Sequence, residues 1–311
     1  RMRRQNEANF ANGNDFNVPF FQAINNAKTR NYSYGFGASG INSLFGSAEV
    51  GYNGYLFLTG TVRNDWFSVL NPENNSILYP SVGGSFVFTD AFKGLPSWLS
   101  FGKVRTSWAQ VGNATVGPYS TNLTYSLNGN THLGLPMASF SSAMGNGGTI
   151  PNPGIRPLTV TEIEVGLDMR LFNNRLGVDF TYYDQQTTDD ILNATISRAT
   201  GFGSTTVNLG QLQNRGVELL LSGSPFKSND FSWDVSLNLA KNKNKVKSLI
   251  EGTNELVLDE PRTRNSFIKH IVGQPFGMIT GRVQRMSPDG QPVFYSDGRQ
   301  EGSAGYEIIA N

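Results

Sequence analysis

Apolar and polar residues alternate with a period of two along much of this chain, and this pattern limits the fold most strongly. The clearest example is EIEVGLDMRL at residues 162–171, where every second side chain is apolar and the others are charged or glycine. Successive side chains of a strand point to opposite faces, so the pattern predicts strands with one apolar and one polar face. The predicted strands lie near residues 43–52, 54–66, 79–90, 101–112, 158–171, 175–186, 214–225 and 231–243.

The length of these strands favours a membrane wall over a soluble sheet. They run to roughly ten residues or more, and a transmembrane strand tilted by about 45° needs about nine to eleven. Strands of globular proteins most often have about five or six residues. Aromatic residues fall near the predicted strand ends, as expected for girdles at the two membrane interfaces. They are Tyr52, Tyr55, Trp66, Tyr79, Phe92, Trp98, Phe172, Tyr183, Phe226 and Phe231.

The connections between the predicted strands alternate between short and long. The short ones are Asn53-Gly54, 91–100, 172–174 and 225–230, and the long ones are 67–78, 113–157, 187–213 and 244–278. Asn-Gly is a preferred hairpin turn because both of its positions require positive φ. Tight turns at one end and long loops at the other are the topology of an outer-membrane barrel. We also expect one or two strands within 279–296, and loop in the first thirty residues.

The composition argues against several classes of function. The net charge is +1 and charged residues make up 16% of the chain, so there is no concentrated basic face for nucleic acid. The densest basic run, Lys241–Lys247, is interleaved with asparagine, and we interpret it as a solvated strand end rather than a phosphate-binding patch.

Chemistry based on cysteine or histidine is also poorly supported. The chain has no cysteine, which removes disulfides, thiolate metal sites and cysteine nucleophiles. His132 and His270 lie far apart in loop-like sequence, so we expect no metal site, no cofactor and no enzyme activity. No run approaches about 18 consecutive apolar residues, so no membrane-spanning helix is predicted.

Several sequence blocks, in a fixed order, resemble one known family. Residues 158–192 contain an E-x-G-x-D strand, an F-x-N-R hairpin and a Y-Y-x-x-x-T-x-D-x-I-L exit. These elements resemble the barrel signature of the TonB-dependent transporters of SusC/RagA type. Further agreeing blocks are Arg63–Asp65, Tyr79–Gly84, Lys103–Asn113, Asn214–Glu218, 237–249 and 272–281. The resemblance covers about residues 40–285.

The resemblance implies an all-β fold, an antiparallel transmembrane β-barrel. The family has a 22-stranded barrel filled by a plug domain, and this chain would supply about eight to ten of those strands. We expect a polar loop and strand entry at 1–42, a partial transmembrane β-barrel at 43–296 and a loop-like tail at 297–311, with the plug domain and the remaining strands absent. An open sheet would leave unpaired edges in lipid. The remaining wall is therefore expected elsewhere in the same protein, the alternative being a small closed barrel.

The resemblance further implies energy-coupled import across the outer membrane of a Gram-negative, Bacteroidetes-like bacterium. The expected substrates are oligosaccharides or oligopeptides. The expected partners are a SusD-like surface lipoprotein, TonB acting through the plug, and outer-membrane lipid. Two alternatives stay open: a passive porin or small structural barrel, and a soluble β-rich adhesin or carbohydrate-binding protein.

The alternation also predicts which charged side chains face the lumen. An unpaired charge on the lipid face costs about 2–4 kcal/mol near the membrane midplane, so carboxylates and guanidinium groups should avoid that face. The predicted lumen-facing residues are Glu162, Glu164, Asp168, Arg170, Asp179, Glu218 and Asp234. We expect them to solvate the lumen or to pair with one another, and direct contact with substrate is the lesser alternative.

The long loops 113–157 and 187–213 hold the best candidates for contact with substrate or with the lipoprotein. Their aromatic residues could stack on a substrate, although packing of the loop itself is the more common use of such side chains. The candidates are Tyr119, Tyr125, Phe140 and Phe202.

Overall fold

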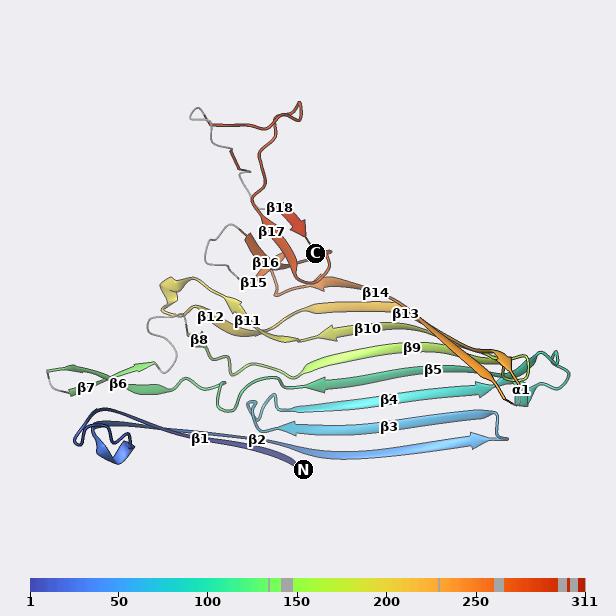
Figure 1. Ribbon diagram of the computed structural model, residues 1–311, viewed down its shortest axis with the longest axis horizontal. Coiled ribbons are helices and arrows are strands. Elements are labelled where there is room, and N and C mark those ends of the chain that lie inside the picture. The colour runs from blue at the N-terminus through green and yellow to red at the C-terminus, as the bar shows by residue number, and fades with distance from the viewer. Residues whose placement is uncertain are drawn as a thin grey trace.

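One antiparallel sheet dominates the protein (Figure 1). The computed structural model describes residues 1–133, 135–140, 148–228, 230–259, 266–295, 301–302 and 307–310. In this part of the chain the sheet has nine strands. In spatial order they are β1 (Met2–Phe16), β2 (Ala27–Tyr52), β3 (Leu56–Phe67), β4 (Ser76–Val87), β5 (Leu99–Asn113), β9 (Leu158–Leu171), β10 (Leu176–Thr188), β13 (Gln211–Lys227) and β14 (Ser232–Ser248).

The structure confirms the antiparallel strands predicted from the alternation. Strands β2 to β5, β9, β10, β13 and β14 occupy the eight predicted segments, most of them extended by a few residues. Every neighbouring pair in the sheet is antiparallel. Strands β1 and β14 form the two edges and do not pair with each other within the described residues. The sheet is therefore an open piece of wall.

The expectation of loop over the first thirty residues was wrong. Strand β1 pairs with the outer half of β2, and the short 3-10 helix η1 (Ile24–Asn26) lies in the turn between them. This hairpin extends past the end of β3, which stops opposite Ile41. Nearly all of β1 is exposed. Because neither face of the hairpin is buried, its sequence has no apolar alternation to reveal a strand.

The tight turns lie together at the end of the sheet where the short helix α1 (Phe88–Ala91) also lies (Figure 1). Asn53 and Gly54 have φ of 49° and 73°, as the Asn-Gly hairpin requires. The turn at 172–174 has positive φ at all three of its residues. Strand β4 ends earlier than predicted because the chain turns into α1 after Val87.

The long connections and the tail contain further short strands, of which only β17, at the start of the segment 279–296, lies where a strand was expected. They are β6 (Tyr125–His132), β7 (Leu135–Phe140), β8 (Thr149–Ile150), β11 (Ile191–Thr195), β12 (Ser204–Asn208), β15 (Glu255–Asp259), β16 (Ser266–Ile271), β17 (Met278–Gly281) and β18 (Glu307–Ala310), with the 3-10 helix η2 (Arg198–Thr200). Strand β18 lies in the tail expected to be loop, where it pairs with β17. Such strands are held by backbone pairing rather than by a buried face, so they leave little periodicity in the sequence.

The two faces of the nine-stranded sheet differ in chemistry. We call the face that carries Arg105, Glu164 and Asp179 the polar face, and the face that carries Val104 and Leu167 the apolar face. Many side chains of the apolar face are exposed. They include Leu44, Val50, Leu58, Val62, Val82, Val104, Ile163, Val165, Phe180, Val217, Leu237 and Leu239. Soluble proteins rarely leave so large an apolar surface uncovered.

Aromatic rings line the short-turn end of the sheet. Tyr52, Tyr55, Phe86 and Phe92 form a chain of edge-to-face contacts, with ring centroids 5.7 to 6.0 Å apart. Farther along the same end Trp98 lies near Phe172, and Phe226 stacks on Trp233. Two residues grouped with these in the sequence belong elsewhere, because the register puts Tyr79 and Tyr183 on the polar face.

Buried apolar clusters are small and lie at the long-loop end. One joins Leu212 and Val246 of the sheet to Leu209, Leu249 and Leu256. A second joins Phe67 to Val69, Leu70 and Ile155. Both lie where the loops fold over the polar-face side of the strand ends. Within the described residues, no helix is long or apolar enough to cross a membrane.

Candidate functional site on the polar face

The strand register gathers the charged residues singled out in the sequence on one face. Glu162, Glu164, Asp168 and Arg170 alternate along β9, and Asp179 lies directly across from Asp168 on β10. Glu218 lies opposite Thr181 on β13. Asp234 of β14 follows the same phase and accepts hydrogen bonds from Ser224 and Ser232. All seven therefore lie on the polar face.

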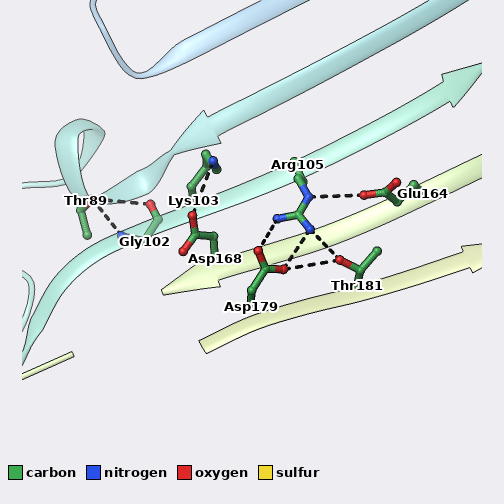
Figure 2. A network of polar contacts seen from close by, with 8 residues as sticks. All are labelled: Thr89, Gly102, Lys103, Arg105, Glu164, Asp168, Asp179 and Thr181. Atoms are coloured by element: carbon green, nitrogen blue, oxygen red, sulfur yellow. Dashed lines mark hydrogen bonds and ion pairs between the residues drawn. The ribbon is translucent and has the colours of Figure 1, made fainter. Parts of the chain in front are cut away.

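Arg105 is the centre of a network that crosses three strands (Figure 2). Its guanidinium donates to Asp179 Oδ1 at 2.9 Å and to Thr181 Oγ1 at 2.6 Å, both on β10. The second terminal nitrogen reaches Asp179 Oδ2 at 3.3 Å, and Nε reaches Glu164 Oε1 on β9 at 3.4 Å. The network therefore ties β5 to β9 and to β10 by side chains as well as by backbone.

A glycine makes room for this network. Gly166 lies directly opposite Arg105 on β5 and Thr181 on β10. A Cβ at Gly166 would come within 2.5 Å of Arg105 Nε and 2.6 Å of its Cζ. Because the glycine of the E-x-G-x-D segment has no side chain, the guanidinium of Arg105 can pass over β9 at this position.

The charges on this face are largely matched in pairs. Lys103 Nζ lies 3.6 Å from Asp168 Oδ2, beside the Arg105–Asp179 pair at 2.9 Å. Two carboxylates directly across a ladder repel each other, so the pair Asp168 and Asp179 needs a cation for each member. The arginine and the lysine supply those cations. Thr89 of α1 exchanges hydrogen bonds with the backbone of Gly102, which holds the helix against β5 (Figure 2).

The other charged residues of the polar face have polar or aromatic neighbours. Gln185 donates to Glu162 Oε2 at 2.7 Å. The guanidinium of Arg170 lies 5.3 Å from the ring centre of Phe101, a cation–π distance. Glu218 is exposed.

A cavity of about 430 Å³ opens on the same face toward the long-loop end. Arg63 lines it and donates through Nε to Asp65 Oδ1 at 2.7 Å and through Nη2 to Ser43 Oγ at 3.2 Å. Tyr79 also lines it, and its buried hydroxyl has no hydrogen-bond partner among the described residues. Phe67 supplies part of the apolar wall. The cavity therefore offers a guanidinium and a phenol beside an apolar surface.

Sequence reasoning missed Lys103, Arg105 and this cavity. Both residues appeared there only within the block Lys103–Asn113. Nothing connected that block to β9, because pairing across 113–157 cannot be read from one sequence. Arg63 was named there only within a family-like block, and Tyr79 was named within another block and among the aromatic residues at strand ends. The signal that could have found them is the shared phase of Arg63, Asp65 and Tyr79 in two strands joined by a hairpin.

Of the four aromatic loop candidates, the described structure places the side chains of Tyr119 and Phe202. Tyr119 is 57% exposed with φ of 62°, and Phe202 is half-buried. Tyr125 and Phe140 are register partners in the β6–β7 ladder, and their side chains lie outside the described part of the structure.

His270 is a structural acceptor in the loop cluster. Its Nδ1 accepts a hydrogen bond from the backbone N–H of Gly277 at 3.2 Å, and its ring meets that of Phe276 edge to face. Burial lowers the pKa of His270 below its usual value, and the carboxylate of Asp190 opposes that shift. Both the accepted hydrogen bond and the lowered pKa therefore favour the neutral imidazole of His270. The described residues contain no group of three His, Cys, Asp or Glu side chains that could hold a metal ion.

Comparison with protein families gives one match along most of the chain. The family model described as "TonB dependent receptor-like, beta-barrel" matches residues 2–269. Among curated proteins, the chain is 30% identical to TonB-dependent receptor P26 of Formosa agariphila over 251 residues, which is 78% of this chain and 24% of that protein. It is 29% identical to TonB-dependent receptor SusC of Bacteroides thetaiotaomicron, over 64% of this chain and 20% of that protein.

Solved structures support the same fold. The structure of the RagAB peptide transporter matches with a TM-score of 0.76 and 21% identity, covering 97% of this chain and 34% of that one. The "open-open" state of the RagAB peptide importer matches with a TM-score of 0.73. This chain therefore spans about a quarter of the curated relatives' length and about a third of the solved chain.

Proposed function

The chain belongs to the TonB-dependent receptor-like β-barrel family, and from this membership we propose that it forms part of the wall of an energy-coupled nutrient importer. Members of this family, SusC among them, are outer-membrane proteins. The observation that carries the proposal is the match over residues 2–269, joined to a nine-stranded sheet with one charged and one apolar face. In the complete barrel the substrate passes inside this wall.

The polar face is proposed to line the lumen. The exposed apolar face is suited to lipid, because only apolar side chains are tolerated there without a cost of about 2–4 kcal/mol per charge near the midplane. The charges of the polar face then meet water, plug or substrate. The network around Arg105 would hold the wall rigid while the interior rearranges, since it links β5, β9 and β10.

The proposed cargo is an oligomeric nutrient, an oligopeptide or an oligosaccharide. Support comes from the RagAB structures, which are named a peptide transporter and a peptide importer, and from the relative named SusC. A SusD-like surface lipoprotein is proposed as the partner above the long loops, and TonB as the partner acting through a plug. The exposed ring of Tyr119 and the cavity beside Arg63 are the proposed points of contact with cargo.

Uptake by the full-length protein in intact cells tests this proposal. Import of a labelled oligomer should stop when TonB is deleted or when a protonophore dissipates the inner-membrane gradient. Binding of the oligomer at the cell surface should survive both treatments. Uptake that continues without TonB would identify a passive pore instead. A native protein that stays monodisperse without detergent would contradict the membrane location itself.

A further inference from the structure

A basic cluster lies on the apolar face of the sheet, at its long-loop end. Lys241, Lys243 and Lys245 alternate along β14, and their intervening neighbours Asn242 and Asn244 lie on the opposite, polar face. Asn244 shows this phase directly, because its side-chain oxygen accepts a hydrogen bond from the N–H of Phe276 in the loop cluster. The asparagines therefore lie on the polar face, and the three lysines lie on the apolar face.

The neighbouring strand adds a fourth cation to this cluster. Arg215 of β13 lies directly opposite Lys243 on the same face. All four side chains are exposed, and none forms an ion pair among the described residues. We call Arg215, Lys241, Lys243 and Lys245 the outward basic cluster.

Among the residues that the structure describes, one carboxylate lies beside the cluster, and it already has a hydrogen-bond partner. Asp184 of β10 lies opposite Arg215. The side-chain amide of Gln213 donates to both of its carboxylate oxygens at 2.8 Å. The cluster therefore presents four cations against one carboxylate, and it leaves room for anionic groups from outside the chain.

The cluster begins where the apolar band stops. Along the same phase of β14 the preceding outward residues are Trp233, Val235, Leu237 and Leu239, each about half exposed. On β13 the apolar-face residue next to Arg215, on the side of the short-turn end, is Val217. In an outer-membrane barrel the long-loop end is the outer end, so these cations lie at the level of the outer-leaflet headgroups.

We propose that the outward basic cluster binds the phosphate groups of an anionic glycolipid in the outer leaflet. Long basic side chains at a membrane interface keep their stems on the apolar band and place their charges among the headgroups. Each lysine or arginine near an anionic lipid surface contributes favourably and roughly additively. If the lysines served only to solvate the strand end, they would have no reason to lie all three on the lipid side. The proposal depends on the orientation of the barrel and not on transport.

Lipid binding by the full-length protein in detergent tests the proposal. The test variant is Lys241→Gln/Lys243→Gln/Lys245→Gln. The matched control, Lys93→Gln/Arg175→Gln/Lys227→Gln, removes three exposed charges from the short-turn end. The probes are phosphorylated lipid A, the same lipid A after removal of its phosphates, and inorganic phosphate, each titrated by native mass spectrometry. Lys241→Arg/Lys243→Arg/Lys245→Arg serves as the variant that keeps the charge.

The expected result is a fall in affinity for phosphorylated lipid A of about tenfold or more in the lysine-to-glutamine variant. The control and the arginine variant should bind as the natural protein does. Dephosphorylated lipid A and inorganic phosphate alone should bind weakly to every variant. Equal lipid binding by the test variant and the control would overturn the proposal. So would inorganic phosphate binding as tightly as the lipid. Heat-resistant migration of each variant on gels verifies that its barrel is folded.

Discussion

Arg105 joins three strands through one side chain, and its contribution to stability depends on where its partners lie. Its side chain is 30% exposed and that of Asp179 is 41% exposed, so water weakens the pair. The larger effect comes from Asp179 and Asp168, which lie directly opposite each other on adjacent strands. Removing the arginine leaves two facing carboxylates, and Asp168 keeps its ion pair with Lys103 whereas Asp179 loses its cation.

Arg105→Gln should therefore destabilise the full-length barrel by roughly 1 kcal/mol. Asp179→Asn should recover part of that loss, because it removes the carboxylate that the arginine neutralised. Thermal unfolding of the two single variants and the double variant, arranged as a double-mutant cycle, measures this coupling. Strictly additive losses would show that the two side chains do not interact in the folded protein.

His270 should make the loop cluster sensitive to acid. Its pKa is lowered in the folded state, so its contribution to stability is complete above the unfolded pKa of about 6.5 and is lost as the pH falls toward the lower folded value. Protonated Nδ1 can no longer accept from the N–H of Gly277. Hydrogen exchange of the β16 and β17 amides should accelerate below about pH 6.5.

His270→Gln provides the control for this effect. The glutamine carbonyl can accept from the same N–H, but it does not titrate. The variant should show exchange in β16 and β17 that changes little through the same pH range, after correction for intrinsic exchange rates. Equal acid sensitivity in both proteins would assign the effect to another group.

The two faces of β9 should tolerate different substitutions. Leu167 lies between Val104 and Phe180 on the apolar face, and Asp168 lies between Lys103 and Asp179 on the polar face. Leu167→Arg should impair assembly, since a charge on the lipid side costs about 2–4 kcal/mol near the midplane. Asp168→Leu should be tolerated, because it also relieves repulsion with Asp179.

The amount of folded full-length protein in the outer membrane measures both effects. The heat-modifiable gel band reports the folded barrel, and total protein by immunoblot corrects for synthesis. If Asp168→Leu were the variant that failed to assemble, the assignment of the two faces would be inverted.

The long strands could be predicted because each has one buried or lipid-directed face, so apolar and polar residues alternate along its sequence. Strand β9 shows this most clearly, and its predicted bounds, 158–171, match the structure. Strand β1 was missed because both of its faces are exposed and its few apolar residues do not alternate with the polar ones. The strands β15, β16 and β18 were missed for a related reason, because short backbone ladders in the loops impose no pattern on the side chains.

The candidate site was only partly predictable, because it depends on which strands pair. The alternation assigned Glu164 and Asp179 to one phase of their own strands. It could not reveal that β5 pairs with β9 across the long connection between them, which is what brings Arg105 to Glu164. The cavity beside Arg63 likewise requires β3, β4 and β5 to lie side by side.

At the scale of the whole molecule, a sheet with so much exposed apolar surface cannot be stable by itself in water. The buried clusters are confined to the loop end, and the strands elsewhere have an uncovered apolar face. Lipid on that face and further strands at both edges would satisfy the apolar groups and the unpaired backbone. The relatives, of which this chain spans about a quarter, are long enough to supply those strands.

The central claim is that the apolar face meets lipid and the polar face meets the water-filled interior. Spin labels placed singly at residues 217–221 of the full-length protein in membranes test it directly, and this part of the protein has no cysteine of its own to interfere. Collision with dissolved oxygen, which concentrates in lipid, should be high at 217, 219 and 221. Collision with a water-soluble nickel complex should be higher at 218 and 220. Loss of this alternation, or the reverse phase, would contradict the account.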